Sequence, residues 1–239
     1  MDSHDCSTDR VAGSLHDGIV LLTEKTRPSQ IPYRALLPKE VDNLLVTVCV
    51  SSTHMGWGTI RVEPTLMHIA ESAAIAATLS LKSEILPVAV SVRELQLSLA
   101  ENRIMLSFFN EFDAKSSEEW SAAVQFFGTK GFFHGYRADL DALVTDSLAE
   151  IWLGGLSRLL SNSDADPMVL ARAVSEEASK TSRNMISRQG FLDKLRAFTT
   201  SKGVPLNKVL GDVQEEGVPK FLSKRECCVV MYRIVKYFA

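Results

Sequence analysis

Hydrophobic and polar positions are arranged differently in the two halves of the chain. Residues 44–50, LLVTVCV, form a continuous apolar run that is typical of a strand buried on both faces of a parallel sheet. A loop, SSTHMGWG, follows at 51–58, and residues 64–81 are good helix formers that begin with a proline accepted in a first turn. The first half therefore predicts a strand, a loop and a helix in succession.

The second half has a helical pattern. Apolar residues recur at helical spacing within 148–160, 191–198 and 230–235. Ser223 and Glu226 have the spacing of a capping box, in which a helix begins with reciprocal side-chain and backbone hydrogen bonds. We therefore expect a mainly α-helical carboxyl-terminal half.

Length and composition fit one large or two small soluble domains. The 239 residues are 46% hydrophobic and 23% charged, with a net charge of −3 that gives no reason to expect a nucleic-acid partner. Apolar runs are too short for a membrane span. Because the polar stretch AKSSEEWSAA begins after Asp113, we expect a first domain at 1–112, a linker at 113–128 and a helical domain of unknown function at 129–239.

The four cysteines point away from metal and iron–sulfur sites, because none belongs to a C-x-x-C pair. Cys227 and Cys228 are expected to be small buried hydrophobes. For Cys49, a buried inert thiol in the apolar run is favoured over a thiol beside a cofactor. The amino terminus, MDSHDC, lacks the basic and apolar regions of a signal peptide, and the localisation is not assigned.

The loop and the helix start after residue 50 suit an anion or an electron-rich cofactor atom. Backbone N–H groups at a helix start are unpaired and carry partial positive charge. Gly56 and Gly58 would let the backbone approach a flat ring, and Arg61 adds a fixed positive charge. The alternative is a tight turn before a core helix, with Arg61 paired to Glu63 or another acid, and spacing alone favours it.

Several motifs of this half occur in an order that resembles a known family. They are MDSH at 1–4, IPYRALLPK at 31–39, NLLVTVCVSSTH at 43–54 and GTIRVEPTLM at 58–67, followed by AESAAIAATLSL. Together they resemble the carboxyl-terminal part of the bacterial FAD-dependent oxidoreductase family. The resemblance covers roughly the first half of the chain.

The resemblance implies a fold, a cofactor and a set of site residues. The fold would be an α/β remnant (strand–loop–helix) of an FAD-binding Rossmann-like domain, followed by a mainly α-helical carboxyl-terminal domain. The cofactor would be FAD. The matching flavin-side positions are Ser52, Thr53, His54, Gly58, Ile60 and Arg61. His54 would also orient or protonate a substrate, and the alternative for it is a loop histidine bound to backbone.

The family binds the FAD pyrophosphate at a G-x-G-x-x-G turn, and the sequence contains no such turn. We therefore expect this chain to be part of an FAD-dependent oxidoreductase, completed by a missing N-terminal FAD-binding part and acting on a small-molecule substrate. The alternative is a non-catalytic flavoprotein remnant with a helical interaction module. An upstream reading frame that encodes the turn would favour the first hypothesis.

Overall fold

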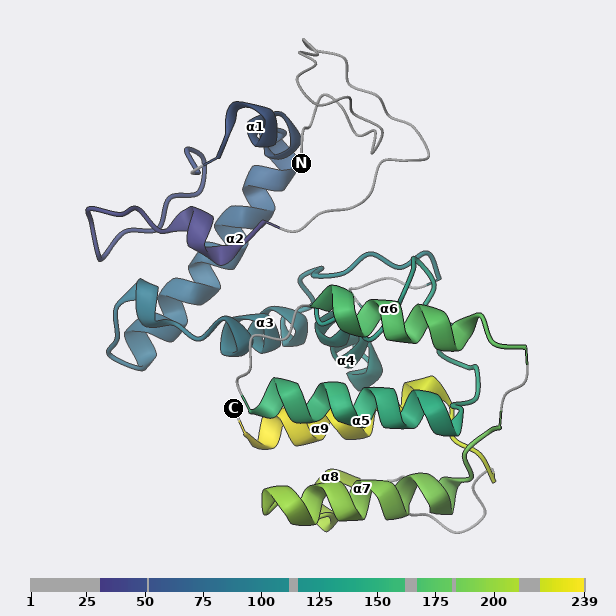
Figure 1. The fold of residues 1–239 in the computed structure, drawn as a ribbon. Helices are drawn as coiled ribbons and strands as arrows, with labels where there is room; N and C mark the ends of the chain where they lie inside the picture. The colour runs from purple at the N-terminus through teal and green to yellow at the C-terminus, as the bar shows by residue number, and fades with distance from the viewer. Residues whose placement is uncertain are drawn as a thin grey trace. The chain divides into compact units, whose positions relative to one another are not determined.

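The computed structural model describes residues 31–50, 52–111, 116–161, 167–181, 184–210 and 220–238. The chain divides into two compact units, the first ending at Leu99 and the second beginning at Ala100. Figure 1 shows that both units are built from helices. The described residues contain no β-strand, only three isolated antiparallel bridges. The expected α/β, Rossmann-like remnant is therefore wrong.

The run at 44–50 explains this difference. Its residues are irregular, and Leu44 and Val48 are 45% and 58% exposed while Val50 is buried. The Val46 N–H donates a backbone hydrogen bond to the Leu36 carbonyl at 2.9 Å. A strand buried in a parallel sheet needs neighbouring strands to bind its backbone groups. The described part of the first unit offers none, so the apolar run packs through single side chains instead.

The first unit is organised around one long helix. Its elements are η1 (Tyr33–Leu36), α1 (His54–Ile60), α2 (Glu63–Lys82), η2 (Pro87–Ala89) and α3 (Val92–Glu101), the last of which continues into the second unit. The helix expected at 64–81 is confirmed as α2, with Pro64 in its first turn. Its Ile69 and Ala73 form a small core with Leu36 and Val50. The Tyr33 hydroxyl donates to the Pro87 carbonyl at 2.8 Å and so ties η1 to η2.

The second unit contains the remaining described helices. They are α4 (Glu119–Gly128), α5 (Asp146–Leu160), α6 (Pro167–Ala178), α7 (Arg188–Lys202), α8 (Asn207–Leu210) and α9 (Lys224–Tyr237). Helix α4 packs on α9, α5 contacts α6 and α7, and α8 contacts α9. None of the helices that the structure describes, in either unit, is long and apolar enough to cross a membrane.

Three short extended segments join the starts of α5, α7 and α9. The bridges Leu143 to Ser223, Thr145 to Met185 and Ser187 to Phe221 connect each segment with the other two. The residue after the centre of each segment caps the following helix by accepting a hydrogen bond from a backbone N–H three residues ahead; these caps are Thr145, Ser187 and Ser223. The three helix starts therefore converge, although their sequences differ.

The expected features of the second half are present at several positions. The capping box of Ser223 and Glu226 is confirmed in both directions. Cys227 and Cys228 are buried, as predicted, and burial raises the pKa of both thiols. Trp152, also fully buried, donates its indole N–H to the Phe132 carbonyl at 3.0 Å. The buried faces of α5 and α9 thus include Trp152, Cys227 and Cys228.

The structure divides the chain at a different place from the predicted linker at 113–128. Residues 119–128 form α4, in which Val124, Phe126 and Phe127 have no exposed surface. Glu118 and Glu119 occupy the helix start, and the buried face begins only after Trp120. Gly131 follows α4 with a φ of +80°, and a side chain there would collide with the Pro167 carbonyl at the start of α6. Glycine therefore permits this close approach.

Candidate cofactor-facing segment and a polar pocket

The expected flavin-side loop is a helix start. Helix α1 begins at His54, after Thr53, whose side-chain oxygen accepts a hydrogen bond from the Gly56 N–H at 3.1 Å. Ser52 donates its hydroxyl to the Thr53 carbonyl at 3.0 Å. Both side chains are exposed, and these contacts satisfy local groups of the chain. The structure therefore gives Thr53 a capping role that the sequence analysis did not assign.

Gly56 lies inside this cap. A Cβ at this position would come within 2.7 Å of the Ser52 Oγ and 3.2 Å of the Thr53 Oγ1. The capping side chains thus account for a small residue here without a cofactor. Gly58 is half-buried within α1. The loop predicted at 51–58 is therefore wrong from His54 onward, because Gly56 and Gly58 are both helical.

The apolar residues of α1 face the core of the first unit. Ile60 and Trp57 pack against the core cluster of Leu36, Val50, Ile69 and Ala73. Ile60, predicted to contact the flavin, is therefore partly used in packing. Trp57 covers the same core.

Arg61 caps the carboxyl end of α1. Its backbone N–H donates to the Trp57 carbonyl at 2.9 Å, and its side chain is exposed. Val62 then caps the start of α2, so Arg61 stands where one helix ends and the next begins. Among the described residues none forms an ion pair with Arg61, and the pairing with Glu63 is not seen. A cation is favourable at the carboxyl end of α1.

Two further residues of this segment, His54 and Cys49, are candidates for contact with the cofactor or substrate. His54 begins α1, but its side chain lies outside what the structure describes. Cys49 is exposed, so the expectation of a buried thiol is wrong for this cysteine. Its neighbour Val50 is turned into the core instead.

These residues do not enclose a flavin by themselves. Ser52 and Thr53 are engaged in the start of α1, Ile60 contributes to the core, and Arg61 is exposed on the surface. A flavin site buries most of its ligand and places several polar groups around it. The described part of this segment offers one exposed face, and we derive no chemical step from it.

A polar pocket lies in the second unit, lined by residues before and within α4, the connection between α4 and α5, the end of α6 and the start of α9. The cavity has a volume of about 860 Å³. Six charged side chains line it, three basic and three acidic: Arg137, Lys224, Arg225, Glu111, Asp139 and Asp141. Trp120, His134, Leu140, Ala142 and Ala178 complete the lining.

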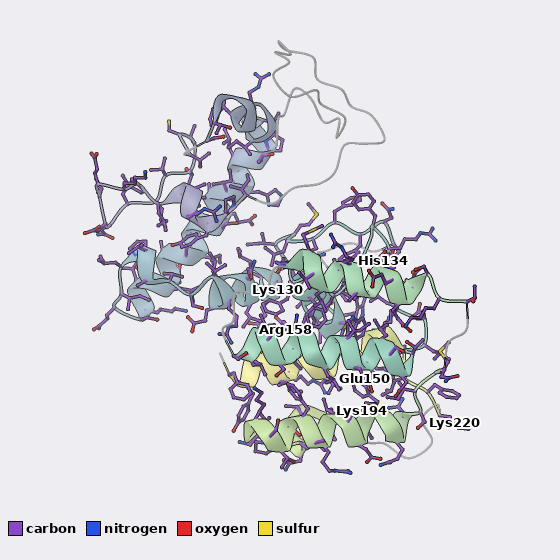
Figure 2. All side chains as sticks on the ribbon, in the orientation of Figure 1. Lys130, His134, Glu150, Arg158, Lys194 and Lys220 are labelled. Carbon is purple, nitrogen blue, oxygen red and sulfur yellow. The ribbon has the colours of Figure 1, made fainter. Side chains whose placement is uncertain are left out.

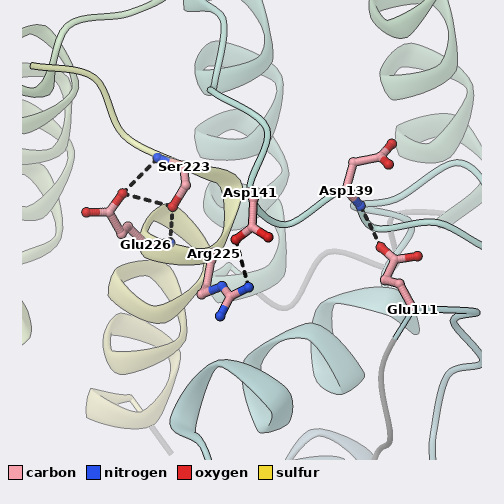
Figure 3. A network of polar contacts seen from close by, with 6 residues as sticks. All are labelled: Glu111, Asp139, Asp141, Ser223, Arg225 and Glu226. Atoms are coloured by element: carbon pink, nitrogen blue, oxygen red, sulfur yellow. Dashed lines mark hydrogen bonds and ion pairs between the residues drawn. The ribbon is translucent and has the colours of Figure 1, made fainter. Parts of the chain in front are cut away.

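Polar contacts between distant segments hold this pocket together, as Figure 3 shows. Arg225 and Asp141 form an ion pair of 2.7 Å, and a Glu111 carboxylate oxygen accepts the Asp139 N–H at 2.7 Å. The Arg225 guanidinium lies over the Trp120 ring, 4.8 Å from its centroid. Figure 2 shows where His134, an exposed residue of the lining, lies on the unit. No sequence motif marks this pocket, because its residues come from segments far apart in the chain.

Part of the chain is similar to a known family. Residues 1–99 match the family described as FAD dependent oxidoreductase. No curated protein and no solved structure matches the chain. The family match indicates an FAD-dependent oxidoreductase-related function and suggests FAD binding. It confirms the resemblance at the level of the family, over the same half of the chain in which the motifs occur.

Proposed function

We propose that residues 1–99 form the flavin-side part of an FAD-dependent oxidoreductase, and that a separate part with a dinucleotide-binding turn completes the site. The family match over these residues carries the proposal. When bound, FAD would accept a hydride from a small-molecule substrate. The exposed face of residues 52–61 would cover one side of the cofactor, since these residues do not surround it.

The residues would have separate roles on that face. Arg61 would place a positive charge near the reduced flavin, where negative charge develops. Ser52 and Thr53 would offer hydroxyl oxygens at the start of α1, and His54 would orient or protonate the substrate. Gly58 and Ile60 would support the helix that carries them.

The first experiment tests whether this chain needs a second polypeptide to bind FAD. The purified chain, titrated with FAD, should retain no stoichiometric flavin and show no flavin absorbance after gel filtration. The tagged chain, isolated from its source cells, should co-purify with FAD and with a polypeptide that contains a G-x-G-x-x-G turn. Stoichiometric flavin in the chain alone would contradict the need for a second part. A native isolate without any flavin would contradict the oxidoreductase function itself.

A second experiment tests Arg61 in that native complex. We expect Arg61→Ala to lower flavin retention or to slow flavin reduction by about tenfold, as loss of a group that stabilises developing charge does. Arg158→Ala is the matched control, since Arg158 is an exposed arginine on α5 of the other unit. If Arg61→Ala only lowers the Tm and leaves flavin content and reduction rate unchanged, its role is structural.

The second candidate function is a non-catalytic flavoprotein remnant with a helical interaction module. It is favoured by the second unit, which has its own apolar core and lies outside the family match. A native isolate that contains partner proteins but no FAD would support it over the first candidate.

A further inference from the structure

We propose that the polar pocket of the second unit binds an uncharged, polyhydroxylated ligand of the carbohydrate class. All of its lining residues belong to the second unit, so the inference does not rest on the proposed flavin function. It rests on the charge balance of the pocket, on its aromatic residue and on the way its walls are fixed.

The charges of the pocket favour a neutral ligand. The lining contains three basic side chains, Arg137, Lys224 and Arg225, and three carboxylates, so the formal charges of these six groups cancel. Within the lining, Arg225 and Asp141 form an ion pair of 2.7 Å. An anion would meet the carboxylates, and a cation would meet the basic groups, each at an electrostatic cost. Among the described residues no group of three His, Cys, Asp or Glu side chains could hold a metal ion.

A polyhydroxylated ligand suits this mixture of groups. Each of its hydroxyls both donates and accepts, so it can bind carboxylates and basic side chains side by side. Asp139, Arg137 and His134 are exposed at the pocket and can make such contacts. Arg225 lies over one part of the half-buried Trp120 ring, and the part of the ring that remains exposed offers an apolar surface of the kind against which the C–H groups of a sugar ring pack. The cavity volume lies within the usual range of ligand sites.

The pocket walls are fixed before a ligand arrives. Backbone hydrogen bonds from Lys224 to Ala142 and from Arg225 to Leu140, both 2.9 Å, join the start of α9 to the connection after α4. Stacking on Trp120 then orients the Arg225 guanidinium. Fixed walls reduce the entropy cost of binding a flexible, hydroxylated compound.

The start of α9 differs from the starts of α5 and α7 in one residue that lines the pocket. The helices α5, α7 and α9 start in the same way, but the residue two positions after the cap is Ser147 in α5, Gln189 in α7 and Arg225 in α9. The stacked arginine therefore occurs at the start of α9 and not at the other two helix starts. We expect one such site in each chain.

The test uses the full chain, fluorescently labelled, on a printed array that carries neutral and anionic oligosaccharides. We expect binding to neutral oligosaccharides, weakened about tenfold by Arg137→Ala, which corresponds to the loss of one hydrogen bond to a charged group. Arg172→Ala is the matched control, an exposed arginine on α6 outside the lining, and should bind like the wild type. Asp139→Asn should also weaken binding, and its backbone φ of 49° is one that asparagine tolerates.

Tryptophan fluorescence gives a second measurement with the oligosaccharide that binds best. The wild type should show a saturable change on titration, whereas Trp120→Phe should bind but lose most of that change. Binding to anionic oligosaccharides alone would overturn the assignment of a neutral ligand. Absence of binding, or binding that neither Arg137→Ala nor Asp139→Asn affects, would overturn the site.

Discussion

Removing the Glu226 carboxylate should destabilise the second unit more than removing any exposed carboxylate of its surface. In α9 this group accepts hydrogen bonds from the Ser223 N–H and the Ser223 hydroxyl, both at 2.8 Å. It also forms an ion pair of 2.6 Å with Arg188, whose side chain is only 13% exposed. One side chain thus closes the start of α9 and binds it to the start of α7.

The size of the expected destabilisation follows from these two roles of Glu226. Loss of the reciprocal cap costs about 1 kcal/mol of unfolding free energy. Loss of a partly buried charge partner adds about 1–2 kcal/mol, because Arg188 keeps its desolvation cost without this carboxylate. We expect Glu226→Ala to lower the free energy of unfolding by about 2–3 kcal/mol and the Tm by about 6–10 °C for a unit of this size.

The effect should depend on pH with a definite sign. Burial alone would raise the pKa of Glu226, but hydrogen bonds from Ser223 and Arg188 outweigh it and lower the pKa below its ordinary value of 4.5. A carboxylate whose pKa is lowered by folding contributes stability that is complete above the pKa of the unfolded state. This contribution is lost as the pH falls through the pKa of the folded state. The difference between wild type and variant should therefore be constant from pH 7 to about 5.5 and shrink below about 4.5.

Urea denaturation followed by circular dichroism, from pH 3.5 to 7, measures both quantities. Glu150→Ala is the control, since Glu150 forms an ion pair of 2.7 Å with Lys194 but is 63% exposed (Figure 2). An exposed pair contributes at most about 1 kcal/mol. Glu226→Gln should retain part of the cap and lose the pH dependence. Equal losses in Glu226→Ala and Glu150→Ala, or a loss unchanged at pH 3.5, would refute the reasoning.

Three further results are expected. Gly131→Ala should lower the Tm strongly, because the φ of +80° and the nearby Pro167 carbonyl leave no room for a methyl group; a Tm equal to the wild type's would contradict this. Iodoacetamide should label Cys49 in the native protein and spare Cys227 and Cys228 until urea unfolds the chain, which peptide mass spectrometry can score. Limited proteolysis should cut between 113 and 118 before it cuts inside α2, and early cleavage in α2 would count against the predicted domain division.

Local signals of the sequence predicted much of the helical structure. The run at 64–81 became α2, and the Ser223 and Glu226 spacing became a capping box, because both depend on residues that are close in sequence. The same reasoning missed the start of α1. Thr53 is a favoured helix cap, but the glycines at 56 and 58 suggested a loop, since glycine is a poor helix former. In the structure the cap and the packing of Trp57 and Ile60 outweigh that weak preference.

The strand and the site needed information that no local stretch contains. An apolar run such as 44–50 becomes a buried strand only where other strands bind its backbone. Without such strands the run packs through single side chains such as that of Val50. The pocket illustrates the same limit for function. Glu111 and Arg225 lie 114 positions apart in the sequence, and neither belongs to a recognisable motif. They line one cavity because the segment of α9 before Glu226 pairs with the connection after α4. The proposed ligand site of the second unit therefore follows from its topology, whereas the proposed function of the first unit follows from motifs that lie close together in the sequence and from the family match over residues 1–99.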